Sequence, residues 1–244
     1  MVSDHHPQPD MNSMISPPSK KVPNSSKIIP AGFVNLQGDL EVPEGATGIV
    51  TFVHGSGSSR HSPRNKYVAS LFRGAGFGTL LFDLLTKSEE QNDAFTGALR
   101  FDIDLLAKRL IGVTQWLENQ PETRGLKIGY FGASTGGAAA LLAAAELGDR
   151  IAAVVSRGGR PDLAGDALRL VRSPTLLIVG GLDDVVICLN EEAYAKLKCE
   201  KDFRIVPGAT HLFEEPGKLE QVAKFSADWF TRHLGGFNDL EEAV

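Results

Sequence analysis

One serine, two aspartates and one histidine stand at spacings that could support acyl transfer. Ser134 lies in the stretch GASTG, residues 132–136, between an apolar run and an alanine-rich run. Asp183 and Asp184 follow a later apolar run, and His211 follows the next one. A serine hydroxyl becomes a nucleophile when a base takes its proton, and that base needs a carboxylate to orient it. The order serine, aspartate, histidine therefore predicts a nucleophile, an acid and a base.

The stretch around Ser134 leaves almost no room for a loop, which predicts a sharp strand-to-helix turn. A GxSxG match alone is weak support, because a serine can also cap the helix that follows it. The strand before it and the helix after it are the context that the motif requires of a nucleophile. Glycines at 132 and 136 would let the neighbouring elements pack close to such a turn. We therefore expect Ser134 at a helix N-terminus, where the dipole favours developing negative charge.

An oxyanion hole needs two backbone N–H groups aimed at the developing charge. We expect one from Thr135, directly after the nucleophile. The other should come from the glycine-rich loop after residues 48–54, with Ser56 as the first candidate and Gly57 as the next. His54 opens this loop, and we expect it to be structural and not the catalytic base.

The same loop allows a rival interpretation, dinucleotide binding. Residues 55–60 read GSGSSR, which approaches the pattern GxGxxG, and Asp83 ends the next strand where a ribose-binding acid would stand. Arg60 replaces the third glycine, however, and would crowd the contact between helix and strand. Dinucleotide binding also leaves the serine, aspartate and histidine without a role, so we treat it as the lesser alternative.

Several basic side chains follow predicted strands, namely Arg60, His61, Arg64, Arg157 and Arg160. They could form a cationic rim for an acidic substrate. They could equally tie loops together through ion pairs and carbonyl contacts, which we favour for Arg157 and Arg160. The candidate substrate-binding residues are Gly57, Arg60, His61 and Arg157.

Strand and helix patterns alternate along the chain, which predicts a mostly parallel sheet with helices on both faces. Ligands of such sheets bind beyond the carboxyl ends of the strands. The predicted strands are 27–34, 35–42, 48–54, 79–83, 128–132, 152–156, 175–179 and 202–206, the first two forming an antiparallel pair. The predicted helices are 67–73, 102–117, 135–147, 163–171, 190–198 and 219–234.

The 244 residues are 42% hydrophobic and 23% charged, which suits one globular domain over residues 27–244. Residues 1–26 are rich in proline, serine and asparagine and lack the apolar core of a secretion signal, so we expect a disordered extension. His5 and His6 belong to that segment.

The net charge of −5 argues against nucleic acid or an anionic membrane as the main partner. Cys188 and Cys199 form no disulfide framework and no CxxC pair. The sequence contains no HExxH motif and no Cys/His cluster, so it implies no metal. It implies no cofactor either. The longest apolar stretch is too short to span a bilayer. A cytoplasmic protein is the expectation, and the oligomeric state is not predicted.

Five stretches make the chain resemble the α/β-hydrolases, specifically the dienelactone-hydrolase-like group, from about residue 27 to 234. They read FVHGSGSSRHSPRN, GYFGASTGG, SRGGRPDLA, LLIVGGLDDVV and PGATHLF. In that group the acid follows the pattern G-x-x-D-x-x-V, which Gly180, Asp183 and Val186 fit, so the resemblance implies Asp183 over Asp184. True dienelactone hydrolases carry a cysteine nucleophile where this chain has Ser134. The resemblance therefore implies a general esterase and not the lactone substrate.

The resemblance implies a single α/β-hydrolase domain of eight strands that cleaves small soluble esters through an acyl-enzyme on Ser134. The short connection after residue 156 leaves no room for a large lid domain, and we expect the segment 85–101 to be the only flexible cover. Thioester or lactone cleavage and acyl transfer to an acceptor stay open on the same residues. A non-catalytic binding protein on this scaffold is the remote alternative, and Asp162 is the reserve candidate for the acid.

Overall fold

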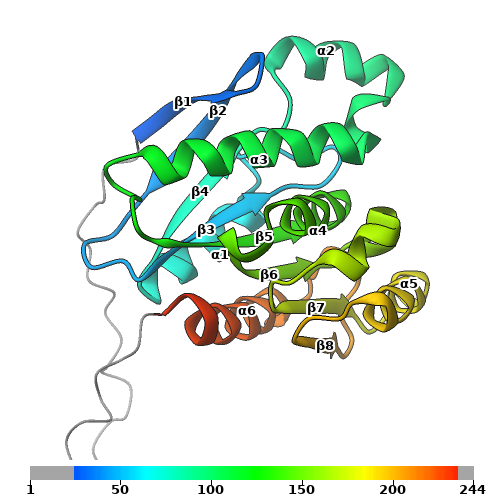
Figure 1. Cartoon of the computed structure of the whole chain (residues 1–244). Coiled ribbons are helices and arrows are strands. Elements are labelled where there is room, and N and C mark those ends of the chain that lie inside the picture. The colour runs from blue at the N-terminus through cyan, green and yellow to red at the C-terminus, as the bar shows by residue number, and fades with distance from the viewer. Residues whose placement is uncertain (1–24, 236–244) are drawn as a thin grey trace, which may run out of the picture.

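The computed structural model describes residues 25–235, which form an eight-stranded sheet covered by helices (Figure 1). Across the sheet the strands lie in the order β1-β2-β4-β3-β5-β6-β7-β8. Their bounds are β1 Ser25–Ala31, β2 Val34–Glu41, β3 Gly48–Val53, β4 Phe77–Phe82, β5 Lys127–Ala133, β6 Ile151–Arg157, β7 Thr175–Gly180 and β8 Lys201–Val206. The extension expected over residues 1–26 lies outside the described residues, apart from the first two residues of β1.

Six α-helices and three short 3-10 segments complete the described part. The α-helices are α1 Pro63–Gly74, α2 Lys87–Thr96, α3 Ile103–Asn119, α4 Thr135–Leu147, α5 Asp184–Lys196 and α6 Lys218–Leu234. The 3-10 segments are η1 Leu99–Phe101, η2 Gly148–Arg150 and η3 Pro161–Leu170. Helix η3 follows β6 directly, and no further domain stands between β6 and β7 within residues 25–235.

The sheet is mostly parallel, as predicted. Only β1 with β2 and β2 with β4 pair antiparallel, while β4, β3, β5, β6, β7 and β8 run parallel. Strands β3, β4 and β7 are buried along their whole length, which explains their largely apolar sequences. The carboxyl ends of the parallel strands therefore meet at one edge, on the right in Figure 1.

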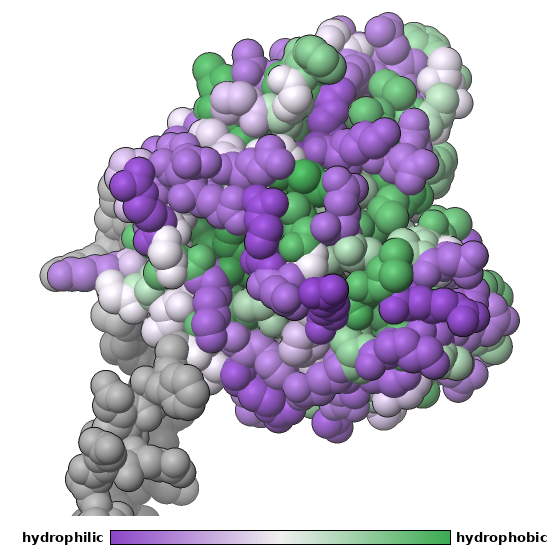
Figure 2. All heavy atoms as spheres, viewed as in Figure 1, coloured by the Kyte–Doolittle hydropathy of each residue, from purple (hydrophilic) through white to green (hydrophobic). Residues whose placement is uncertain are grey.

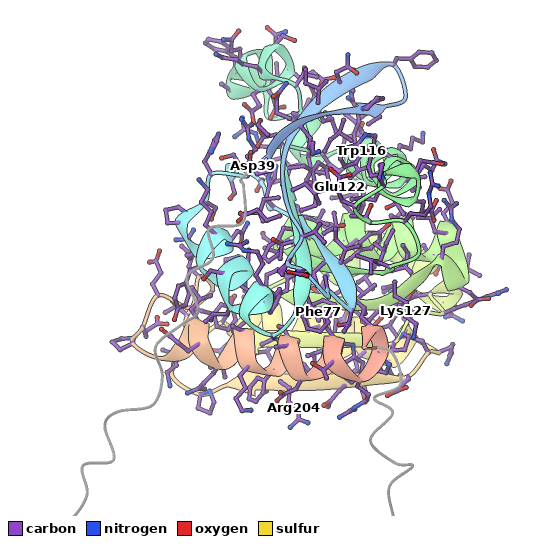
Figure 3. All side chains as sticks on the ribbon, turned by 90° about the vertical axis from the view of Figure 1, so that its left-hand side faces the viewer. Asp39, Phe77, Trp116, Glu122, Lys127 and Arg204 are labelled. Carbon is purple, nitrogen blue, oxygen red and sulfur yellow. The ribbon has the colours of Figure 1, made fainter. Side chains whose placement is uncertain are left out.

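Two hydrophobic cores lie on opposite faces of the sheet, so the prediction of helices on both faces is confirmed. Leu110 of α3 and Leu141 of α4 pack in one core. Phe72 of α1 and Phe230 of α6 pack in the other, with their ring centroids 5.6 Å apart. In Figure 3 helices α1 and α3 stand on opposite sides of the sheet. Helices therefore cover both faces of the sheet beneath its carboxyl edge.

The segment 85–101, expected to be a flexible cover, contains helix α2. Its N-terminus is a capping box: the Thr86 hydroxyl accepts the Glu89 N–H, and the Glu89 carboxylate accepts the Thr86 N–H. Beyond the helix, the Arg100 guanidinium donates to the nearly buried Asp93 carboxylate over 2.5 Å. Polar contacts thus order a segment whose composition offered little apolar periodicity.

Helices α1 and α5 begin earlier than predicted. Helix α1 starts at Pro63 and not at residue 67, because the Ser62 hydroxyl caps it and proline suits the first helical position. Helix α5 starts at Asp184 and not at residue 190. Its first turns carry the sequence DVVICL, whose apolar run hides the helical period.

Candidate active site

Ser134 forms the whole connection between β5 and α4. Its φ of 51° and ψ of −125° lie in a region that non-glycine residues rarely adopt. Its carbonyl accepts the N–H groups of Gly137 and Arg160, each over 3.0 Å. The side chain makes no capping hydrogen bond to α4. The interpretation that Ser134 merely caps the helix is therefore wrong, and the strained turn presents its hydroxyl at the carboxyl edge of the sheet.

The glycines that flank the serine are dictated by close backbone contacts. A Cβ at Gly132 would lie 2.6 Å from the Gly136 carbonyl oxygen. A Cβ at Gly136 would collide with the Val53 carbonyl oxygen of the neighbouring strand. Any larger residue at either position would push the turn away from the sheet, which is the physical reason for the spacing of the motif.

His211 and Asp183 are in direct contact. His211 Nδ1 lies 2.6 Å from Asp183 Oδ2, and the two residues follow β8 and β7 respectively. A Cβ at Gly180 would lie 2.5 Å from the Ala209 and Thr210 carbonyl oxygens, so this glycine lets the two loops approach. With the Nδ1–H donated to the carboxylate, the histidine Nε2 is free to accept a proton.

The other two candidate acids lie elsewhere. Asp184 is exposed in the first turn of α5, where a carboxylate favours the helix dipole. Asp162 accepts two hydrogen bonds from the Arg160 guanidinium, over 2.9 and 2.8 Å. Of the three aspartates, the structure thus places only Asp183 against the histidine.

Ser134 and His211 line one cavity of about 520 Å³, together with Gly57, His61 and Arg157. No hydrogen bond joins Ser134 Oγ to His211 within the described residues. Such bonds are often long in ligand-free sites and tighten when substrate binds. The cavity therefore brings the nucleophile, the base and three of the four candidate substrate-binding residues together.

The loop after β3 is tied to the nucleophile turn by a contact that the sequence analysis missed. The Ser56 N–H donates to the Thr135 hydroxyl over 2.9 Å. The Ser58 N–H closes a turn on the Gly55 carbonyl, with Gly57 at a φ of 74°. The Ser56 amide, our first candidate for the oxyanion hole, is thus engaged. The Gly57 amide donates no hydrogen bond in the described part of the chain, and Gly57 lines the cavity of Ser134.

His54 is a buried structural histidine. Its Nδ1 lies 3.0 Å from the Gly55 carbonyl, and its Nε2 lies 3.1 Å from the Leu84 nitrogen. The Leu84 N–H can only donate, so Nε2 accepts and Nδ1 carries the proton. Burial lowers the pKa of His54, and the Gly55 carbonyl and Asp83 oppose this only in part. A neutral His54 thereby joins the β3 loop to the end of β4.

Arg60 lies outside the cavity, against the expectation that it binds substrate. Its backbone and guanidinium both donate to Asp83, and its Nε lies 3.6 Å from Asp39. The ion-pair interpretation thus applies to Arg60, as it does to Arg160. The same contacts occupy the Asp83 carboxylate that dinucleotide binding would need for a ribose.

Arg157 is the exception among these basic residues. It is 6% exposed, and its guanidinium makes no hydrogen bond or ion pair in the described residues. Burial, with a smaller contribution from Arg64, lowers its pKa to about 10. The expectation that ion pairs or carbonyl contacts hold Arg157 is therefore wrong.

A second cavity of about 290 Å³ lies against the same glycine-rich loop. Leu84, Leu85 and Leu106 give it apolar walls, and Glu90 of α2 adds a carboxyl group. Burial and the nearby Asp83 raise the pKa of Glu90. On the face shown in Figure 2, hydrophobic residues interrupt the polar surface near the right-hand edge, between α2 and α5. The exposed hydrophobic side chains include Phe95 of α2, Phe101 of η1, Leu182 before α5 and Val185 of α5.

Among residues 25–235, no group of three or more His, Cys, Asp and Glu side chains is arranged to hold a metal ion. No helix in this range is both long and apolar enough to cross a bilayer. Cys188 is exposed and Cys199 partly buried, and both are free thiols.

Similarity to known proteins covers most of the chain. The model of the Dienelactone hydrolase family matches residues 36–240. A solved dienelactone hydrolase from Anabaena variabilis is 57% identical, with a TM-score of 0.85 over 86% of this chain and 98% of that one. Est1E from Butyrivibrio proteoclasticus shares the fold at 15% identity, with a TM-score of 0.71 over 85% of this chain and 98% of that one. The α/β-hydrolase fold is thereby confirmed.

Two relatives in strains of Mycobacterium tuberculosis are each 62% identical over 206 residues and are named "Putative phosphoribosyl transferase". The match covers 84% of this chain but 46% of those proteins. The chain thus spans about half of their length, and their name describes proteins with at least as much sequence again outside the matched part.

Proposed function

Because the chain belongs to the dienelactone hydrolase family, we propose that it is a serine hydrolase that cleaves carboxylic esters of small substrates through an acyl-enzyme on Ser134. Membership of that family and the esterase neighbours support hydrolysis in general. The choice of a serine nucleophile and of ester bonds is our inference from the site.

The observation that carries the proposal is the strained Ser134 facing a cavity that also contains His211, itself bonded to Asp183. A backbone strain of this kind costs of order 1–3 kcal/mol and persists only where surrounding structure enforces it. A scaffold that only binds ligands has no use for a strained serine beside an oriented histidine. Catalysis is therefore favoured over the binding-protein alternative.

The proposed reaction proceeds in two steps. Ser134 Oγ attacks the ester carbonyl while His211 Nε2 takes its proton, and the same proton then passes to the leaving alcohol. Water attacks the acyl-enzyme with His211 again as the base, which releases the acid and restores the serine. Asp183 holds the imidazole in the required tautomer and stabilises its positive form.

The backbone amides of Thr135 and of the loop at Ser56 and Gly57 are the proposed oxyanion donors. Helix α4 begins at Thr135, so its N-terminal dipole adds to the stabilisation of the developing charge. Because the Ser56 N–H already donates to the Thr135 hydroxyl, the Gly57 N–H is the favoured oxyanion donor of this loop.

Small esters fit the site better than long lipids do. The cavity of about 520 Å³ lies at an edge to which no lid domain is joined within the described residues. Thioesters, lactones and acyl acceptors other than water would use the same groups and stay alternatives. The net charge of −5 and the two free cysteines support a small molecule as partner and a reducing, cytoplasmic setting.

The proposal is tested with p-nitrophenyl acetate, butanoate and octanoate. We expect the short esters to be turned over best, and Ser134→Ala to lose a factor of about 10⁴ or more without unfolding. Ser70→Ala is the matched control, because Ser70 is exposed on α1 and bonds only the Tyr67 carbonyl. Turnover by Ser134→Ala within tenfold of the unmodified protein would refute the assignment.

A further inference from the structure

Arg157 is the last residue of β6 and lies beside the proposed nucleophile. In the parallel pair of β5 and β6 it stands opposite Ala133, the residue before Ser134. Its guanidinium carbon is 5.7 Å from the centre of the Phe213 ring. It lines the same cavity as Ser134 and His211. A permanent positive charge is thus built into the wall of the reaction site.

This charge has no counter-charge within the described residues. The Arg157 Nε is buried without a hydrogen-bond partner, and no carboxylate pairs with the guanidinium. The charged neighbour that acts on it most is Arg64, a second cation. Its pKa of about 10 keeps Arg157 protonated at neutral pH all the same. Proteins rarely bury an unpaired charge, because no interaction in the protein then replaces the lost hydration.

The rest of the cavity wall is also suited to an anion. None of the residues that line it is acidic, and they include His61 and Arg64. Arg64 stands in the first turn of α1, whose N-terminus adds positive potential. Its carboxylate partner among the described residues, Glu214, lies 2.5 Å away and is more than half exposed.

We propose that Arg157 binds an oxyanion carried by the substrate, a carboxylate or a phosphate, so that the preferred substrates are anionic esters. This inference rests on the proposed esterase function and adds the substrate class. A guanidinium forms bidentate hydrogen bonds to either oxyanion, and both bonds strengthen where water is excluded. The substrate then supplies the counter-charge that the protein lacks.

The test compares esters of similar acyl length whose far end is either neutral or anionic. The substrates are p-nitrophenyl pentanoate, the p-nitrophenyl half-ester of succinate, and p-nitrophenyl 3-phosphonopropanoate, assayed in 0.15 M NaCl to screen long-range steering. For the unmodified protein we expect kcat/KM at least about tenfold higher for one or both charged esters than for the pentanoate. The better of the two identifies the oxyanion as carboxylate or phosphate.

Arg157→Gln should remove this preference, so that kcat/KM for the charged esters falls at least about tenfold relative to kcat/KM for the pentanoate. Arg160→Gln is the matched control, because its guanidinium is three residues away and already paired with Asp162. It should keep the preference. Inorganic phosphate should also inhibit the unmodified protein competitively, more strongly than chloride at equal ionic strength, and Arg157→Gln should lose that inhibition.

Several results would overturn the inference. The first is that the unmodified protein shows no preference for a charged ester. The second is that Arg157→Gln keeps the preference, and the third is that it loses activity equally on all three esters. The charge preference is measured on the unmodified protein, so it can be decided even if Arg157→Gln fails to fold. If pentanoate is hydrolysed through Ser134 without any charge preference, the anion site fails and the esterase proposal stands. If no ester is hydrolysed, the esterase proposal itself fails.

Discussion

At the scale of single residues, the site depends on which carboxylate meets the histidine. The chain offers Asp183 and Asp184 as neighbours; chain order allows either, and the family spacing G-x-x-D-x-x-V implies Asp183. In the structure Asp183 precedes α5 and turns toward His211, while Asp184 begins the helix and faces solvent. The two side chains therefore have different surroundings despite their adjacency.

This difference predicts opposite outcomes for two matched substitutions. Asp183→Asn should fold and lose a factor of about 10⁴ in turnover, because the amide favours the wrong histidine tautomer. Asp184→Asn should stay within about threefold of the unmodified protein and lose at most about 1 kcal/mol of stability, from the helix dipole. Both are assayed on one short ester, with circular dichroism to verify folding.

The reverse pattern would transfer the orienting role to Asp184. Full activity in both variants would mean that His211 needs neither carboxylate.

At the scale of elements, close backbone contacts in the β5–α4 turn require glycine at position 136. Gly136→Ala should destabilise the protein by about 1–3 kcal/mol and reduce turnover, because the new methyl group collides with the Val53 carbonyl. Gly74→Ala is the control, since a Cβ there meets nothing within 4 Å at the end of α1, and it should be neutral or stabilising by up to about 1 kcal/mol. Urea unfolding measures both.

Equal stability of the two alanine variants would show that the turn tolerates a side chain, and the steric explanation of the motif would be lost.

The elements most accessible to sequence reasoning were those whose pattern matches their burial. The buried strands β3 and β7 appear as largely apolar runs, and α3 shows a clear helical period. Helix α2 was not predicted from the sequence, because its order comes from the Thr86–Glu89 capping box and the Arg100–Asp93 ion pair. The pattern of hydrophobic residues carries no signal for such contacts.

For the site, chain order and strand ends were enough to name the serine and the histidine, while the choice of Asp183 over Asp184 came from the family resemblance. The environments of the arginines were not readable from the sequence: both follow predicted strands, yet Arg60 contacts Asp83 while Arg157 contacts no acid among the described residues. The bond from the Ser56 amide to the Thr135 hydroxyl joins residues 79 positions apart. A contact of that kind depends on how two loops pack and leaves no trace in local sequence.

At the scale of the whole molecule, the sheet separates two cores, and one buried and one partly buried histidine link its stability to pH. Burial lowers the pKa of His54, and that of His233 in α6. In the unfolded chain both are expected near 6.5. Between the folded and unfolded pKa values the unfolded chain binds more protons, so the stability present above about pH 6.5 is lost as the pH falls.

We therefore expect the free energy of unfolding to fall between pH 7 and 5, with each histidine adding a slope of at most about 1.4 kcal/mol per pH unit. His54→Asn should reduce this slope while lowering stability at pH 7, because the Leu84 N–H loses its acceptor. Adding His233→Asn should flatten the curve further. Denaturant titrations at each pH measure the slopes, and an unchanged slope in the double variant would exclude both histidines as its cause.

The central claim, that Ser134 is an activated nucleophile, is tested most directly by covalent labelling. A p-nitrophenyl alkylphosphonate releases nitrophenol as it binds a nucleophilic serine, and the labelled residue is then mapped by peptide mass spectrometry. We predict one equivalent of nitrophenol per chain and a single adduct on Ser134, no adduct in Ser134→Ala, and labelling slowed at least about a hundredfold in His211→Ala. Labelling at another residue, or equally fast labelling without His211, would contradict the account.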